Sequence, residues 1–283
     1  MSAGGGRIER YSAHSVRILA RGSWPAERLR ASWTASSHRL PPAAQEQVDD
    51  AWVDALARPG VHLYNGALCR LEGYAVGASG LHLRLSRTTY KDYLGTNVRH
   101  PEWAEQAGGQ LMANPVGTSV ALSSGDGFLI FGMRSDRVAL YPCHAHPFGG
   151  TMEVPEPGSS VDLIAEMARE LAEEVGIACD ELDDLRAIAV TEDRTVRQPE
   201  LVYAGQTRLL RADIEARLDL HEHTACWSLA ECRSDIEGAL LGSTPLTPVL
   251  RATLLAWGAD RYGPAWLHRM HPGDPGETAA TGL

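Results

Sequence analysis

Glutamate side chains gather in one short stretch of the chain at a spacing that suits metal chemistry. A helix drawn through residues 160–177 places four of them within an arc of roughly 100°: Glu166, Glu170, Glu173 and Glu174. Like charges at i,i+4 destabilise a helix by about 0.2–0.5 kcal/mol per pair, and Arg169 is the only cation nearby in the sequence. Mg²⁺ or Mn²⁺ bound by these hard oxygen ligands would relieve the repulsion. A solvated acidic helix face is the alternative interpretation.

The elements that must position these carboxylates can be predicted from the flanking residues. The opposite face of the helix carries an apolar stripe that predicts docking on a core: Ile164, Ala168, Leu171 and Val175. Gly176 is placed to end the helix as a left-handed C′ glycine, with Ile177 packing back. The run from Pro157 to Ser160 predicts a turn followed by the helix N-cap.

The stretch resembles a known family motif, the Nudix box, G-x5-E-x7-R-E-U-x-E-E-x-G-U with U aliphatic. Its second half matches the run from Arg169 to Ile177, and its first half matches Gly150 to Glu156. Twelve residues separate Glu156 from Arg169 where the box has seven. We expect the five extra residues to lengthen the loop before the helix.

The resemblance implies a fold and roles for the box residues. The fold is an α/β/α sandwich with a mixed sheet, here preceded by a smaller α+β region. The implied metal ligands for Mg²⁺ (or Mn²⁺) are Glu170, Glu173 and Glu174. Arg169 orients one of these glutamates by a bidentate pair, and Glu156 holds the loop. Gly149 and Gly150 let the backbone approach the helix and the substrate phosphates closely; without the box they would be an ordinary turn.

The general base that activates water has several candidates. Glu174 could itself serve, as could Glu170 or Glu222, which precedes a strand containing Trp227. A surface glutamate between two histidines is the alternative interpretation of Glu222, and Glu200 is a weaker candidate. The run from Cys143 to His146 has zinc-type ligands, but only three, without a distant partner.

A second segment narrows the resemblance. The run from Leu83 to Asn97 is similar to the region before the Nudix domain in the animal UDP-glucose/UDP-galactose diphosphatases. This likeness implies hydrolysis of a UDP-hexose to UMP and hexose 1-phosphate. Tyr90, Tyr93 and Asn97 are then candidates for binding the base or ribose, although the tyrosines could equally pack the N-terminal part onto the core. Another substrate, such as ADP-ribose or a dinucleotide, and a non-catalytic nucleotide-binding module stay open as alternatives.

Composition limits the partners. The formal net charge is −10 and no long basic run occurs, which argues against nucleic acid or an anionic membrane. No segment approaches eighteen apolar residues, so we expect a cytoplasmic protein without a membrane span. Five scattered cysteines do not predict a disulfide framework. A homodimer fits the resemblance, since many Nudix proteins pair.

The predicted organisation has four parts. Residues 1–10 are expected to be disordered, 11–112 to form the α+β region, 113–265 the Nudix domain and 266–283 a flexible tail. Expected strands cover 11–20, 61–71, 81–86, 116–122, 128–133, 185–190, 201–209 and 225–229. Expected helices cover 43–57, 101–112, the acidic helix, 212–218 and 247–261.

Overall fold

A mixed seven-stranded sheet forms the centre of the computed structural model, which describes residues 15–58, 63–106, 109–136, 138, 140–156 and 159–272. Strand β5 runs parallel to β9, and the other pairs are antiparallel. The order across the sheet, with β7 (Ala145–His146) added beside β6, is β1 (Val16–Trp24), β8 (Leu182–Asp193), β9 (Gln198–Thr207), β5 (Gly117–Ser123), β6 (Phe128–Arg134) and β10 (His223–Ala230).

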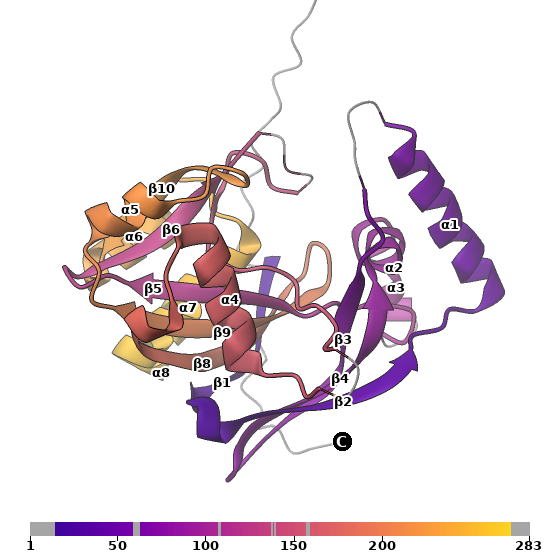
Figure 1. Ribbon diagram of the computed structural model, residues 1–283, viewed down its shortest axis with the longest axis horizontal. Coiled ribbons are helices and arrows are strands. Elements are labelled where there is room, and N and C mark those ends of the chain that lie inside the picture. The colour runs from indigo at the N-terminus through magenta and orange to yellow at the C-terminus, as the bar shows by residue number, and fades with distance from the viewer. Residues whose placement is uncertain are drawn as a thin grey trace, which may run out of the picture.

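Helices cover both faces of this sheet, as Figure 1 shows. Alternate residues of a strand point to opposite faces, so Val120 of β5 packs toward α4 (Leu163–Val175) while Ala121 packs toward α7 (Pro248–Tyr262). The α7 face also carries α6 (Arg233–Leu241) and α8 (Pro264–Met270), and α5 (Arg211–Arg217) lies near α4. The α/β/α sandwich expected from the resemblance is confirmed.

The N-terminal region forms a second, smaller unit beside the sandwich (Figure 1). Its sheet has the order β2 (Leu29–Ser37), β4 (Gly80–Thr89) and β3 (Ala67–Gly77). Helix α1 (Pro42–Leu56) and the short helices α2 (Tyr90–Tyr93) and α3 (Trp103–Gln106) accompany it, with a π-helical turn at Leu94–Val98. Leu81, Leu83 and Leu85 of β4 are buried in the same apolar cluster as α4, so the two units share one core.

The structure corrects two expected boundaries. The first strand, predicted at 11–20, is β1, and it pairs with β8 of the large sheet because Val16 and Ile18 are buried in the core on the α7 face. The N-terminal region is therefore not a separate unit from residue 11. The flexible tail expected from 266 is wrong for the residues of α8, where Trp266 is buried and donates a hydrogen bond to Glu237 Oε1 at 2.8 Å.

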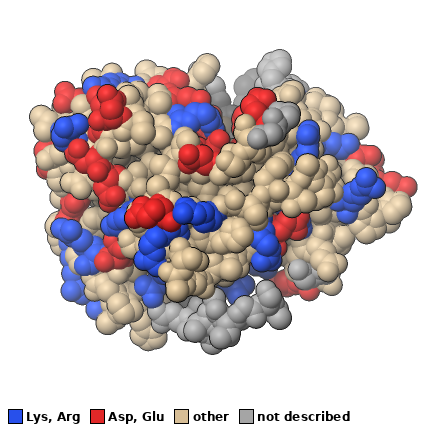
Figure 2. Space-filling model, turned by 60° about the horizontal axis from the view of Figure 1, so that its bottom comes forward, with Lys and Arg blue, Asp and Glu red and all other residues tan. Residues whose placement is uncertain are grey.

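Other expectations have mixed outcomes. Of the helix expected at 101–112, the described residues form only the single turn α3, and residues 107 and 108 lie outside the described ranges. All five cysteines are described and free. The disorder expected for 1–10 and the part of the tail from 273 lie outside the described residues. None of the helices in the described ranges is long and apolar enough to span a bilayer. Figure 2 shows acidic and basic side chains interspersed on the face that it presents.

Candidate active site

Helix α4 is built by local signals at both ends. The Asp162 side chain caps it by accepting hydrogen bonds from Ile164 N and Ala165 N at 3.1 and 3.0 Å, which satisfies amides that the first helical turn leaves free. The cap is thus Asp162 and not the serine pair that we expected, because the extra residues leave 159–162 outside the helix. Gly176 ends the helix at φ 59°, as predicted.

Arg169 gathers three of the acidic side chains of α4. Its guanidinium lies 3.2 Å from Glu166, 2.7 Å from Glu170 and 2.8 Å from Glu173. Part of the repulsion inferred from the sequence is therefore relieved by one cation that contacts three carboxylates, where we had expected a bidentate pair with one; Glu174 is not among these three.

Glu170 lies against the glycine pair of the box. A Cβ on Gly150 would come within 2.6 Å of Glu170 Oε1, so any larger residue there would require this carboxylate to move. Burial raises the pKa of Glu170 to about 7; Arg169 opposes this shift, and the charges of Glu174 and Glu173 add to it. A carboxylate that is costly to ionise in a dry site gains most from a bound cation.

Both oxygens of Glu174 are held. Gly149 N donates to Oε2 at 2.7 Å, and His223 Nε2 lies 3.0 Å from Oε1. Burial raises the pKa of Glu174, while the bonds from His223 and Gly149 act in the opposite direction. Gly149 has φ 142°, and a Cβ there would lie 1.9 Å from Thr118 O, so the close approach of this loop to β5 requires glycine.

These carboxylates open onto a small cavity of about 210 Å³. Its lining joins the box to the segment before β10: Gly149, Gly150, Glu170, Glu173, Glu174, Asp219, His221, Glu222 and His223. Among the described residues no three acidic, histidine or cysteine side chains already converge as metal ligands. The carboxylate oxygens are nevertheless ligands of the hard type that Mg²⁺ and Mn²⁺ prefer. Burial disfavours the ionised forms of Glu170 and Glu174, and a bound cation would favour them.

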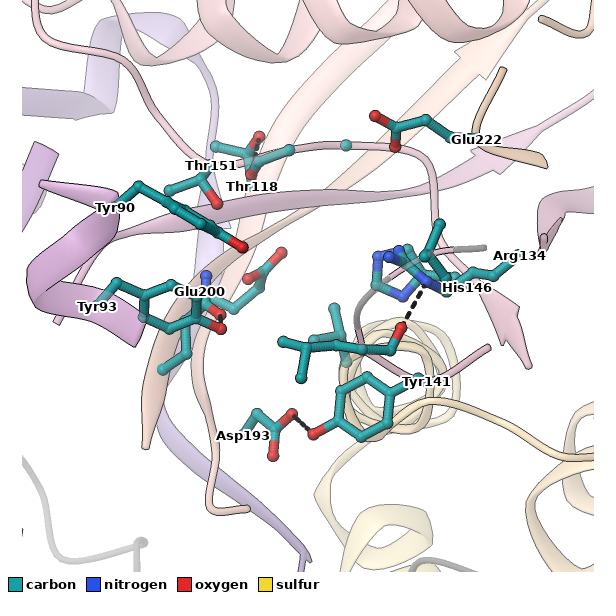
Figure 3. Close-up of a pocket in the computed structure, with 16 residues that line it drawn as sticks. Tyr90, Tyr93, Thr118, Arg134, Tyr141, His146, Thr151, Asp193, Glu200 and Glu222 are labelled. Atoms are coloured by element: carbon teal, nitrogen blue, oxygen red, sulfur yellow. Dashed lines mark hydrogen bonds between the residues drawn. The ribbon is translucent and has the colours of Figure 1, made fainter. Parts of the chain in front are cut away.

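A larger cavity of about 420 Å³ adjoins the first and shares Gly149, Gly150 and Glu222 with it. Figure 3 shows tyrosines from both structural units around it. Tyr93 donates from its hydroxyl to Gln198 Oε1 at 2.7 Å. Tyr141 donates to Asp193 Oδ2 at 2.6 Å.

Two acidic residues that line this larger cavity, Asp193 and Glu200, are buried. Burial raises the pKa of Glu200 to about 8, with the charges of Asp193 and Glu170 adding to the shift against a hydrogen bond from Ser119. Arg134 donates from Nε to Leu140 O at 3.1 Å and thereby ties the loop before β7 to the end of β6. The lining offers tyrosine hydroxyls, the Gln198 amide and the Glu200 carboxyl, whose ionisation is disfavoured by burial, together with the charged groups Arg134, Asp193 and Glu222. These donors and acceptors can bind a polar group.

Most of the predicted site residues come together around the two cavities. Tyr90 and Tyr93 line the larger cavity, and Tyr90 also packs edge-on against Trp52 at 6.3 Å between ring centroids. Glu222, with an exposed side chain, stands where the two cavities meet. The box glutamates and glycines lie as described above.

Two predicted residues lie elsewhere. Asn97 is fully buried and does not line either cavity; its side chain donates to Arg197 O at 3.0 Å and accepts from Asn114 N at 3.1 Å. It therefore fastens α2 and the following turn to the β8–β9 connection, which is a structural role, and the structure places it outside the lining of both cavities. Glu156 is exposed, and its carbonyl oxygen accepts a hydrogen bond from Ser159 N at 2.9 Å. A role for its side chain in holding the loop stays a prediction.

The zinc interpretation of Cys143 to His146 is not supported. Cys143 is exposed, His144 Nδ1 lies 2.8 Å from Pro142 O, and His146 Nδ1 lies 2.9 Å from Thr247 Oγ1. These side chains are engaged separately, and no metal cluster occurs within the described ranges.

Sequence reasoning missed several residues of the site, among them His223, Arg134, Tyr141 and Asp193. His223 stands next to Glu222 at the start of β10, so the strand boundary was a usable signal for it. Arg134, Tyr141 and Asp193 reach the larger cavity only through the pairing of distant strands and the fold of the loop before β7. No local pattern marks them.

Part of this chain is similar in sequence to known proteins. No family model matches. Uridine diphosphate glucose pyrophosphatase NUDT22 of Bos taurus is 30% identical over 210 residues, which cover 59% of this chain and 72% of that protein. The Homo sapiens protein of the same name is 33% identical over 151 residues, covering 48% of each chain.

Solved structures with a similar fold are more distant. The MutT protein from Methanosarcina mazei Go1 is 17% identical with a TM-score of 0.37, over 52% of this chain and 94% of that one. A C. elegans Ap4A hydrolase in a binary complex is 16% identical with a TM-score of 0.35, over 52% and 99%. Likeness at this level carries no argument about substrate.

Proposed function

Because this chain belongs to the Nudix hydrolase family, we propose that it is a nucleoside diphosphate sugar diphosphatase that cleaves UDP-glucose or UDP-galactose to UMP and hexose 1-phosphate. The observation that carries this proposal is the junction of two cavities at Gly149 and Gly150. One cavity is lined with carboxylates and suits a cation with a diphosphate, whereas the other can bind a polar group. The names of the relatives are in line with this substrate class.

Glu170, Glu173 and Glu174 would hold a divalent cation, with Mg²⁺ favoured and Mn²⁺ the alternative, at the small cavity. Such a cation, when bound, neutralises the diphosphate oxygens that the acidic lining would otherwise repel. Arg169 keeps Glu170 and Glu173 near each other through its two charge-assisted bonds. Gly149 and Gly150, without side chains, leave the backbone open to the phosphates.

Glu222 is our choice for the general base, with Glu174 and Glu170 as the alternatives within the cluster. It stands at the junction of the cavities with an exposed carboxylate. In the proposed reaction a water oxygen attacks one phosphorus in line, the bond from that phosphorus to the bridging oxygen breaks, and the water proton passes to the base. The products are UMP and the hexose 1-phosphate.

The larger cavity would hold a polar end of the substrate. Tyr90 and Tyr93 from α2 offer ring faces and hydroxyls there, and Gln198 and Glu200 offer hydrogen bonds from β9. Binding at this place makes the N-terminal unit part of the active site, in keeping with the resemblance of residues 83–97 to the UDP-sugar diphosphatases.

Product analysis tests the proposal. Purified protein is incubated with UDP-glucose, UDP-galactose, ADP-ribose and NADH, each with Mg²⁺ and with EDTA, and the nucleotides are separated by chromatography. We expect UMP from the UDP-hexoses only when metal is present. AMP from ADP-ribose, with the UDP-hexoses intact, would reject the substrate class while keeping the box chemistry. Loss of turnover in Glu222→Gln with full activity in Glu46→Gln, an exposed glutamate of α1, would support the base.

A further inference from the structure

We infer that His223 is a positioning residue, which holds the carboxylate of Glu174 in the orientation needed for cation binding; this inference rests on the proposed function. Neither the family motif nor the box spacing points to this histidine, which lies 49 residues after Glu174 in the sequence. Its role follows from the contacts that β10 brings to the end of α4.

The contact fixes one oxygen of Glu174. His223 is 1% exposed, and its Nε2 lies 3.0 Å from Oε1, while Gly149 N donates to Oε2 at 2.7 Å. His223 Nδ1 is buried without a hydrogen-bond partner among the described residues. We therefore assign the ring proton to Nε2, where it donates to the carboxylate. Glu174 then has one donor on each oxygen, and neither oxygen can turn away without losing a buried hydrogen bond.

Packing holds the imidazole in place. Gly132 of β6 faces the ring, and a Cβ there would lie 2.2 Å from Nδ1. The ring of Phe148 meets the imidazole edge-on, with 5.5 Å between centroids and an angle of 89°. Because the ring is wedged between β6 and the residue before the glycine pair, its donor can point only toward α4.

The consequence concerns affinity for the cation. A carboxylate held by two donors presents its remaining lone pairs in fixed directions, and loss of such a supporting contact typically costs about 10–100-fold in metal affinity. His221, Glu222 and His223 all line the small cavity, and of these three His223 makes the contact to Glu174. Because its Nε2 is engaged by that carboxylate, we assign its effect on the cation to the orientation of Glu174.

The test measures Mn²⁺ binding to the full chain without nucleotide, by electron paramagnetic resonance of free Mn²⁺, together with melting temperature. His223→Leu removes the donor and keeps an apolar side chain, whereas His223→Gln restores an N–H donor at similar reach. We expect the leucine variant to bind Mn²⁺ about 10–100-fold more weakly and the glutamine variant to bind within about threefold of the wild type. His82→Gln, at an exposed histidine of β4, is the matched control and should not change affinity.

Two outcomes overturn the inference. They are wild-type affinity in His223→Leu, and equal weakening in the leucine and glutamine variants, which would mean that only packing matters. If the leucine variant does not fold, Gly132→Ala takes its place, because its methyl group displaces the ring from the opposite strand. Glu174→Gln separates the role of His223 from the proposed function. If Glu174→Gln loses Mn²⁺ binding while His223→Leu keeps it, the role of His223 is refuted and the proposed function stands. If the wild type does not bind Mn²⁺, both are refuted.

Discussion

Glu174→Gln is the substitution for which the structure gives the sharpest expectation. The carboxylate accepts one hydrogen bond on each oxygen, from Gly149 N and from His223 Nε2. A glutamine has the same shape but only one acceptor oxygen, so its NH₂ group must face one of the two donors. The variant therefore loses one charge-assisted bond and leaves one buried donor unpaired.

The magnitude follows from these contacts. A hydrogen bond to a charged group contributes about 1.5–3 kcal/mol to stability. Part of this loss is offset, because burial raises the pKa of Glu174 and so disfavours the ionised form that the substitution removes. A net loss of about 1–2 kcal/mol remains, which corresponds to a fall of about 2–8 °C in Tm for a chain of this size. The fold should stay intact.

Turnover should fall far more than stability. If Glu174 is a metal ligand or the base, its neutral analogue should lower kcat by about 10²–10⁴-fold, the range that one positioned acid or base contributes. The assay is UMP release from UDP-glucose with Mg²⁺, run beside circular dichroism melts and with Glu46→Gln as the control. A folded variant that keeps more than half of the wild-type kcat would refute the assignment of this glutamate.

Three further predictions test other parts of the site. Gly149→Ala places a methyl group 1.9 Å from Thr118 O at φ 142°, so thermal melts should show a loss of about 1–3 kcal/mol together with loss of turnover; unchanged melting would contradict the close approach. The pKa of Glu200 is raised from 4.5 to about 8 in the folded chain, so the folded state binds the Glu200 proton more tightly than the unfolded state does. The stability that this proton contributes to the fold is fully present below pH 4.5 and is lost as the pH rises to 8. In urea unfolding at a series of pH values, the free energy of unfolding of the wild type should fall by up to about 1.4 kcal/mol per pH unit in that window because of Glu200. Glu200→Gln should lack this contribution, and equal slopes in the two proteins would contradict the raised pKa of Glu200. Tyr141→Phe removes the bond to Asp193 and should raise KM for the UDP-hexose about fivefold, about 1 kcal/mol, with little change in kcat; a lower kcat at constant KM would place the hydroxyl in the chemical step instead.

The residues that the sequence predicted well are those whose roles depend on local geometry. Helix α4, its C-terminal glycine Gly176 and the convergence of the box glutamates follow from a 3.6-residue period and a left-handed end. The strands β5 and β6 were expected at 116–122 and 128–133, on either side of the turn residues Gly125, Asp126 and Gly127 that favour a hairpin. These features need no knowledge of distant parts of the chain.

The residues that were misplaced depend on tertiary contacts. Asn97 sits in a polar, aromatic segment that suggested ligand binding, yet its amide bonds to backbone atoms brought from the β8–β9 connection and from Asn114. Strand β1 has an ordinary alternating pattern, and nothing in it indicates that its partner is β8, more than 150 residues away. His223 was passed over because its partner Glu174 lies on another element.

The insertion between Glu156 and Arg169 is the departure of this chain from the box, and the structure shows how the box residues still meet. The two halves of the box meet through space, at Gly149 with Glu174 and at Gly150 with Glu170. The first half is anchored to β5 by hydrogen bonds from Thr118 N to Gly150 O at 2.7 Å and from Val120 N to Phe148 O at 3.1 Å.

The second half is anchored by the apolar face of α4, where Met167, Leu171 and Val175 are fully buried. Neither anchor depends on the length of the loop between them. Six of the twelve residues between Glu156 and Arg169 belong to α4, so only residues 157–162 separate Glu156 from the helix. Closure entropy rises by only about 0.6 kcal/mol for each doubling of loop length, and Asp162 supplies the cap where the helix begins. A box with this insertion can therefore present the same carboxylates to the same glycine pair, and the extra residues are no argument against catalysis.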